Sequence, residues 1–188
     1  MMKKTTIFLI VVLLASCHSH PEVEEKTEPS AVQQQMIEEG WRLGNPNEGD
    51  LSEEYGVTAR LGIVDNYFDI ELGGDADMVV KIVDIETGST ARYLFVPHNS
   101  RTTINEIPNG KYYLKFAYGN DWMSRSDGYH TEGKFTRNVV YEKSNDFFDF
   151  GDAGSLESVS YSLKIKLERN RRYEGLSTST ITEEEFNK

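Results

Sequence analysis

Apolar and polar residues alternate with a period of two over most of the chain, from Val57 to Leu167. Such alternation is typical of strands that bury one face and expose the other. Clusters of Gly, Asn, Asp and Ser, which favour turns, separate the alternating segments. The pattern predicts about eight short strands, at 57–63, 67–72, 78–85, 92–96, 102–107, 111–118, 135–141 and 158–167, with a short edge strand at 147–150.

The most regular of these segments follows the turn Pro108-Asn109-Gly110. One face of its strand carries large side chains, those of Tyr112, Leu114, Phe116 and Tyr118. We expect the other strands to cover this face. The alternation stops at Gly119, and residues 119–133, which are rich in Gly, Asp and Ser, are predicted to form a loop. Many short strands without a long helix favour an all-β fold, and we predict an antiparallel β-sandwich over residues 57–170.

The N-terminus predicts export and a lipid anchor. Lys3 and Lys4 precede an apolar run, Ile7–Leu14, which is shorter than the roughly 20 residues that a spanning helix needs. We interpret residues 1–16 as a signal peptide. The sequence Leu-Ala-Ser-Cys that ends at Cys17 resembles the bacterial lipobox, which implies cleavage before Cys17 and diacylglycerol on its thiol. Cys17 is the only cysteine in the chain and has no disulfide partner. The alternative is an ordinary signal peptide with a chance cysteine.

A tether and a helix are expected to follow. Residues 17–30 are polar, acidic and interrupted by two prolines, so they are predicted to form a disordered linker. Ser30 and Gln33 have the spacing of a capping box, which predicts a short helix from Ala31 to about Glu39 within a helix-and-loop segment, 31–56. Residues 171–188 are predicted to be a polar tail, in which Thr182 could cap one helical turn.

Charge narrows the range of partners. The formal net charge is -11 at pH 7. An acidic surface repels phosphate backbones and anionic lipid headgroups, so nucleic acid is excluded as an expected partner. Attachment to a bilayer would therefore depend on the acylated Cys17 and not on a basic patch.

Residues 77–122 resemble the carboxypeptidase-regulatory-like and transthyretin-like modules, whose sandwiches share the two-sheet form of immunoglobulin-like domains. The resemblance lies in a Val-rich strand, a turn at Gly88, and the motif Pro108-x-Gly110-x-Tyr112-x-Leu114. The chain also looks like a group of Bacteroidetes-type lipoproteins that share the sequence Tyr-Gly-x-Asp-Trp, here 118–122. Both resemblances imply a non-enzymatic module. The acidic residues Glu22, Glu24 and Glu25 after Cys17 look like the export signal of some Bacteroidetes-type lipoproteins, which implies attachment to the outer membrane, on its periplasmic or surface face.

The corner formed by Tyr118, Asp121 and Trp122 is the first candidate for a binding site, together with Tyr129 and His130 in the predicted loop. Exposed Trp and Tyr side chains stack on sugar rings or anchor protein interfaces. The alternative is that Trp122 packs into the interior and closes one end of the sandwich. We favour this alternative for Trp122, because tryptophan is highly buried on average.

No catalytic, metal or cofactor site is predicted. The domain lacks a free thiol and any close pair of histidines, so the sequence gives no zinc signature. The pairs Asp75/Asp77 and Asp149/Asp152 match no calcium loop and are interpreted as solvated turn residues. Gly-x-Ser-x-Gly and phosphate-loop motifs are absent from the sequence.

Two hypotheses for function follow from the sequence. The first is a membrane-anchored, non-catalytic β-sandwich that acts through contacts with other envelope proteins. The second is a carbohydrate-binding module that presents Trp122, Tyr118 and Tyr129 to glycans. An enzyme is the third class, and nothing in the sequence supports it.

Overall fold

The computed structural model describes residues 28–167, 172–174 and 176–188. Within these residues the fold is all-β, with two short helices, α1 (Ala31–Glu38) and α2 (Glu183–Asn187). The predicted signal peptide, Cys17 and the predicted linker up to residue 27 lie outside the described residues, so the structure does not address them.

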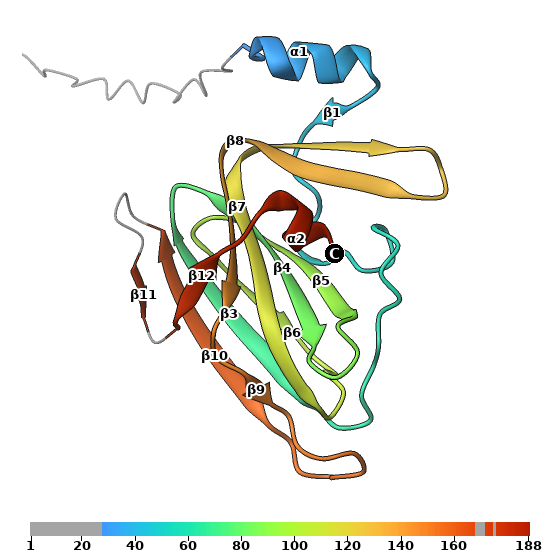
Figure 1. The fold of residues 1–188 in the computed structure, drawn as a ribbon, viewed down its shortest axis with the longest axis vertical. Helices are drawn as coiled ribbons and strands as arrows, with labels where there is room; N and C mark the ends of the chain where they lie inside the picture. The colour runs from blue at the N-terminus through green and yellow to red at the C-terminus, as the bar shows by residue number, and fades with distance from the viewer. Residues whose placement is uncertain (1–27, 168–171, 175) are drawn as a thin grey trace, which may run out of the picture.

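The strands form two sheets (Figure 1). Sheet A has the order β12 (Thr178–Thr180), β8 (Thr131–Ser144), β7 (Lys111–Ser126), β4 (Asp77–Asp84), β5 (Thr90–Val96) and β2 (Gly49–Asp50). The short strands β1 (Arg42–Leu43) and β9 (Phe148–Asp149) also pair with β7. Sheet B has the order β11 (Arg172–Glu174), β10 (Ser160–Leu167), β3 (Tyr67–Gly74) and β6 (Ser100–Ile104).

The prediction of a wholly antiparallel fold is wrong at one pair, because β3 and β10 run parallel along their full lengths. A two-residue turn can join only antiparallel neighbours, whereas parallel strands need a long connection. Here the connection from β3 to β10 contains most of sheet A, so nothing in the local sequence of either strand indicates the direction of pairing.

The inner faces of the two sheets enclose one hydrophobic cluster. The face of β7 predicted from the sequence is confirmed, since Tyr112, Leu114, Phe116 and Tyr118 all belong to this cluster. Sheet B contributes residues such as Phe68 from β3 and Ile165 from β10. The hydroxyl of Tyr112 donates a hydrogen bond of 3.1 Å to the carbonyl oxygen of Pro108, which holds the preceding turn against the strand.

The strand predicted at 57–63 does not form. The segment has the alternation of a strand, but its amide groups bond to separate parts of the chain: Arg60 N donates to Ala91 O of β5 in sheet A, and Gly62 N donates to Glu106 O in the loop after β6 of sheet B. A chain that crosses between two sheets cannot form a ladder with either. Gly62 lies so close to Ile107 that a β-carbon would come within 2.7 Å of its carbonyl oxygen.

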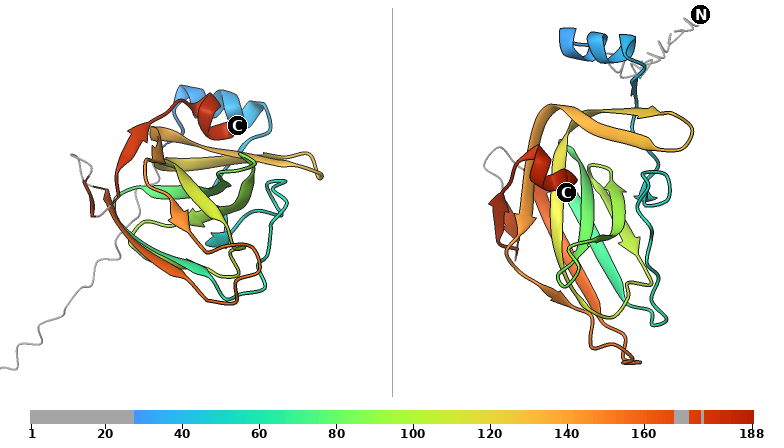
Figure 2. Two further views of the ribbon diagram at one scale, coloured as in Figure 1. Left: turned by 60° about the horizontal axis from the view of Figure 1, so that its bottom comes forward. Right: turned by 45° about the vertical axis from the view of Figure 1, so that its right-hand side comes forward.

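The loop predicted at 119–133 is mostly strand. β7 continues to Ser126 and β8 begins at Thr131, so the two strands form a long hairpin that projects from the sheet (Figure 2). The sequence Gly119-Asn120-Asp121 forms a bulge, where the pairing of β7 with β8 shifts in register. Asp121 has φ 57° there, a left-handed conformation that Asp tolerates better than most residues. The pairing advances two residues along β7, from Tyr118 to Asn120, against three along β8, from Val140 to Arg137, so the extra residue lies in β8. Across this bulge the alternation of β7 reverses, and Trp122 lies on the same face as Ala117.

The predicted polar tail instead helps to cover sheet A. β12 pairs with β8, and α2 packs on the outer face of the sheet, which is the face turned away from sheet B. Phe186 of α2 is 4% exposed and joins a second hydrophobic cluster with Tyr93, Trp122 and Phe135. The capping box predicted at Thr182 is confirmed, since its hydroxyl accepts from Glu185 N and the Glu185 carboxylate accepts from Thr182 N.

The predicted N-terminal helix is confirmed as α1, with a capping box between Ser30 and Gln33. Gly40, with φ 91°, follows the helix. The loop that leads from α1 to β3 also supplies Leu51 and Tyr55 to the second cluster, so the segment 31–56 is part of the packed domain.

Candidate functional site

Trp122 is 1% exposed and lies at the centre of the second cluster. Its ring meets that of Phe135 edge to face at 4.8 Å between centroids, and its Nε1 donates to the hydroxyl of Tyr55 at 3.3 Å. The bulge in the β7–β8 pairing is what directs the indole to this face. The expectation that Trp122 packs inside is confirmed, although it packs on the outer face of sheet A and does not close an end of the fold.

Tyr118 is also buried, on the inner face of sheet A, and its hydroxyl donates to the carboxylate of Glu142. Trp122 and Tyr118 therefore lie on opposite faces of sheet A, and neither is exposed. Of the three rings that the glycan hypothesis presents, Trp122 and Tyr118 are therefore buried, and Tyr129 is exposed.

A pocket of about 540 Å³ opens on the outer face of sheet A, between the β7–β8 hairpin, the 51–57 loop and α2. Aromatic side chains form much of its wall, and the polar groups at its rim come from the hairpin and α2. Its lining includes Trp41, Tyr93, Trp122, His130, Tyr141, Lys81 and Phe186.

His130 and Tyr129 lie at the turn of the hairpin. His130 lines the pocket, and its ring approaches Gly56, where a β-carbon would come within 2.9 Å of Nδ1. The backbone amides of both residues donate to the carboxylate of Asp127, which holds the turn in shape. Tyr129 is 100% exposed, so its side chain is free to contact a partner, and His130 is exposed as well.

Lys81 lines the same pocket and was not among the residues singled out from the sequence. Its Nζ donates to the carbonyl oxygen of Phe186 at 2.9 Å and lies 4.7 Å from the centre of the Phe186 ring. Burial, reinforced by the nearby charge of Lys115, lowers the pKa of Lys81 to about 8. The sequence could have indicated Lys81 as a candidate residue, because it is the single charged residue inside the apolar run 78–83.

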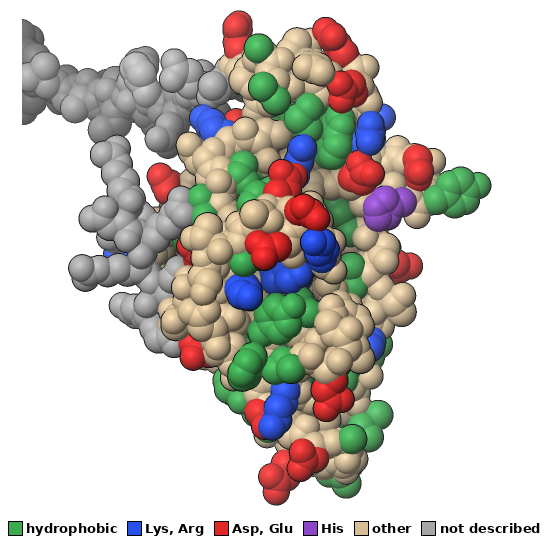
Figure 3. Space-filling model, viewed as in Figure 1, with side chains coloured by type: hydrophobic (Ala, Val, Ile, Leu, Met, Phe, Trp, Pro, Cys, Tyr) green, Lys and Arg blue, Asp and Glu red, His purple; other side chains and the backbone are tan. Residues whose placement is uncertain are grey.

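Three lysines stand side by side across sheet A. Lys81 of β4 pairs with Lys115 of β7, and Lys115 pairs with Lys143 of β8. Like charges opposite one another destabilise a sheet by roughly 0.2–1 kcal/mol per pair. The α2 carbonyls compensate in part, because Lys115 Nζ donates to Glu185 O at 2.6 Å as Lys81 does to Phe186 O. Figure 3 shows the basic and acidic side chains gathered on this face near α2.

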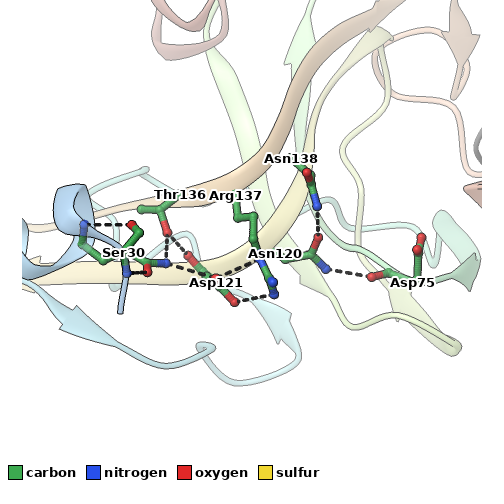
Figure 4. Close-up of polar contacts among 8 residues, drawn as sticks. Ser30, Asp75, Asn120, Asp121, Thr136, Arg137 and Asn138 are labelled. Atoms are coloured by element: carbon green, nitrogen blue, oxygen red, sulfur yellow. Dashed lines mark hydrogen bonds and ion pairs between the residues drawn. The ribbon is translucent and has the colours of Figure 1, made fainter. Parts of the chain in front are cut away.

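Asp121, the remaining residue of the predicted corner, has a structural role in the contacts shown in Figure 4. Its carboxylate accepts from Gln33 Nε2 of α1 at 3.0 Å and forms an ion pair with Arg137 at 3.0 Å. The Thr136 hydroxyl bonds both Gln33 and the Asp121 carbonyl oxygen. These contacts fix α1 to the base of the hairpin.

A second, smaller hollow of about 240 Å³ lies on the other side of Trp122 and is lined by Asp77, His98 and Asp121. Asp77 is 6% exposed and accepts hydrogen bonds from the Asn45 side chain at 2.7 Å and from the His98 amide at 2.8 Å. His98 Nδ1 is 2.7 Å from the same carboxylate. These bonds give Asp77 a role in joining the N-terminal segment to the end of β5.

The end of the molecule opposite α1 exposes three large aliphatic side chains. Leu61, Ile63 and Leu156 are 63%, 88% and 81% exposed. They project from two loops, 57–66 and 151–159, which we call the tip. Exposed acidic residues surround them, namely Asp65, Glu106, Asp152 and Glu157, and none of these forms an ion pair within the described ranges. The lower end of Figure 3 shows this mixture of apolar and acidic side chains.

Two asparagines hold the tip loops in place. Asn66 is fully buried, donates to Ile107 O at 3.0 Å and accepts from Val159 N at 2.8 Å. Asn109 donates to the carbonyl oxygens of Asp152 and Ser155 at 3.0 and 2.8 Å. The apolar side chains of the tip are therefore presented on loops that are tied to the core, which lowers the entropic cost of binding.

Among the residues with described positions, no group of three or more His, Cys, Asp or Glu side chains could hold a metal ion. In the same part of the chain, neither helix has the length and apolar character needed to cross a membrane. Comparison of the chain with protein-family models, with curated proteins and with solved structures found no match.

Proposed function

We propose that the protein is a lipid-anchored, non-catalytic module of the bacterial outer membrane that binds another envelope protein through its tip. The anchor in this proposal is the acylated Cys17, supported by the lipobox-like sequence and by the short apolar run before it. The observation that carries the binding role is the exposed aliphatic group of Leu61, Ile63 and Leu156.

The layout of the molecule supports contact at a distance from the bilayer. The linker would enter at α1, which lies at one end of the long axis, and the tip loops lie at the other end (Figure 1). The exposed acids around the tip disfavour insertion into an anionic leaflet. They favour a partner whose apolar cleft is bordered by Lys and Arg, because complementary charges steer association and select partners.

We also propose that the two sheets form a β-sandwich of the transthyretin-like kind. Support comes from the single cluster that both sheets enclose and from the motif at 108–114. In that motif Gly110 has φ 142° and allows the Tyr112 ring to lie against the turn, so that its hydroxyl reaches Pro108 O.

Photocrosslinking in living cells tests the tip. A photoreactive amino acid at position 63 should give a crosslink to an envelope protein, and the same group at position 32 should not. Val32 is a matched control, since it is 65% exposed but belongs to α1. The crosslink should weaken in Glu157→Lys and at high ionic strength, where the screening length falls to about 3 Å in 1 M salt.

Three outcomes contradict the proposal: crosslinking only to lipid, crosslinking only to a second copy of this chain, or equal crosslinking at positions 63 and 32. The anchor has its own test. Cys17→Ser should abolish incorporation of labelled palmitate and release the protein from the membrane fraction. Incorporation that persists in Cys17→Ser would refute acylation at Cys17 without bearing on the tip.

A further inference from the structure

Lys81 lacks the partner that a largely buried lysine usually has. Neither Lys81 nor Lys115 forms an ion pair with a carboxylate in the described part of the chain, although the protein carries 31 acidic residues. Buried charges in proteins are normally paired or bound to a ligand. The packing of the three lysines, Lys81, Lys115 and Lys143, therefore does not by itself explain why they lie side by side in an acidic protein.

The ammonium group of Lys81 keeps capacity for a ligand. It has three N–H donors, and one is used by the carbonyl oxygen of Phe186. The neighbouring rings of Tyr93 and Phe186, at 5.7 and 4.7 Å, accept no conventional hydrogen bond. Because Lys81 lines the pocket, the remaining donors can be reached by an anion within it.

The other charges of the pocket are already matched. Glu132 pairs with Arg125 at 3.0 Å, Glu183 lies 3.9 Å from Lys134, and Lys188 pairs with Glu184 at 2.9 Å. Lys81 is therefore the charge of the pocket that lacks an opposite charge among the described residues. An anion bound in the pocket would supply the opposite charge for Lys81.

The walls select the rest of the ligand. Trp41, Tyr93, Trp122 and Tyr141 line the space. Trp41 and Tyr141 are half-buried and offer ring surface to a flat ring, including that of a sugar, whereas Trp122 and Tyr93 are 1% and 5% exposed. A volume of about 540 Å³ lies in the range of small-molecule sites, which is about 300–1,000 Å³.

We propose that this pocket binds a small carboxylate-bearing ring compound, with its ring against the aromatic walls and its carboxylate accepting hydrogen bonds from Nζ of Lys81. Two sources supply this chemistry: uronic-acid sugars and aromatic acids. The proposal uses a different surface from the tip, so it stands or fails independently of the protein-binding role proposed above.

Intrinsic fluorescence gives a direct test, because both tryptophans of the chain, Trp41 and Trp122, line the pocket. The full chain in detergent is titrated with methyl glucuronide and with phenylacetate. Each acid has a neutral counterpart, methyl glucoside and phenylethanol. We expect one acid to change the emission in a saturable way. We expect the affinity of its neutral counterpart to be at least about tenfold lower. The acid that binds identifies the source.

Lys81→Met tests the assignment to this residue. Methionine retains the apolar stem, and the variant should lose the preference for the acid. Lys143→Met is the matched control at the exposed end of the lysine row, and it should keep that preference. Circular dichroism checks that both variants fold. The comparison of each acid with its neutral counterpart uses the unchanged protein, so it tests the proposal even if a variant does not fold.

Three results would overturn the proposal. The first is no saturable change with either acid up to about 10 mM, which corresponds to negligible affinity. The second is equal affinity for an acid and its neutral counterpart. The third is a preference for the acid that a folded Lys81→Met retains.

Discussion

The two faces of sheet A are covered in different ways. Its inner face meets a second sheet, and the cluster between them contains mostly aliphatic side chains. Its outer face is covered by separate pieces, namely the 51–57 loop, the β7–β8 hairpin and α2, and here the side chains are largely aromatic. Pieces that come from distant parts of the chain leave space between them, and the pocket occupies that space. The inner face thus provides stability, whereas the outer face provides a site.

The largest effect is expected on the inner face. Phe116→Ala should lower the free energy of unfolding by about 3–5 kcal/mol, because Phe116 is fully buried between two sheets that cannot close the cavity. Urea denaturation followed by circular dichroism measures this change. A loss in the free energy of unfolding below about 1 kcal/mol would contradict the tight packing of the inner face.

A methyl group added to the hairpin should have the next largest effect. A β-carbon on Gly133 would lie 2.3 Å from Cζ2 of Trp122 and 2.8 Å from Cε1 of Tyr55. The indole is held between Tyr55 and Phe135, so Gly133→Ala should cost about 1–3 kcal/mol through overpacking and should alter Trp122 fluorescence. Gly73→Ala is the control, since its β-carbon would meet its nearest neighbour at an ordinary 3.7 Å. Equal stability of the two variants would contradict the packing described for the hairpin.

The same Phe-to-Ala change made on the outer face should cost less. Phe186→Ala is expected to lower the free energy of unfolding by about 1–2 kcal/mol, because α2 can detach without opening the main cluster. With the helix displaced, Lys81 regains water and its pKa should rise from about 8 towards the ordinary 10.5. Nuclear magnetic resonance of the lysine side chains measures this pKa. A loss of stability equal to that of Phe116→Ala would remove the distinction between the two faces.

The last expected effect is a dependence of stability on pH. Because the pKa of Lys81 is lower in the folded state than in the unfolded state, the unfolded state binds more protons between pH 8 and 10.5. The free energy of unfolding contributed by Lys81 should therefore rise with pH in that window, by at most about 1.4 kcal/mol per pH unit. Subtracting the profile of Lys81→Met cancels the tyrosines, whose raised pKa values act in the opposite sense. Identical profiles for the two proteins would contradict the depressed pKa.

The sequence predicted the strands that have clear alternation and local turns, such as β3, β4 and β5, and the capped helix α1. It failed where the outcome depended on distant partners. Residues 57–63 alternate correctly but cross between the sheets, and the direction of the β3–β10 pair has no local signal. The prediction of a polar tail at 171–188 was wrong, because Ile181 and Phe186 bury their side chains although most of their neighbours in the sequence are polar or acidic.

The candidate site was predicted in part. Trp122 and His130 do line one pocket, but Tyr118 faces the opposite side of the sheet, and Asp121 holds α1. The bulge explains this outcome, because the alternation of β7 reverses across it and places Tyr118 and Trp122 on opposite faces, which simple alternation cannot reveal. Lys81 could have been noticed as the lone charge in an apolar strand. Its alignment with Lys115 and Lys143 required the register of three strands.

The parallel pairing of β3 with β10 has a consequence for how the chain folds. Partners in this ladder, such as Tyr67 and Ser160, are far apart in sequence, and contacts of this kind slow folding because a long loop must close first. The β3–β6 pair can form earlier, but sheet B is not complete until β10 has emerged, and its cover of the inner face of sheet A stays partial until then. A chain that must cross a membrane before it folds would benefit from such an order, because its core closes only after nearly all of its strands have been delivered.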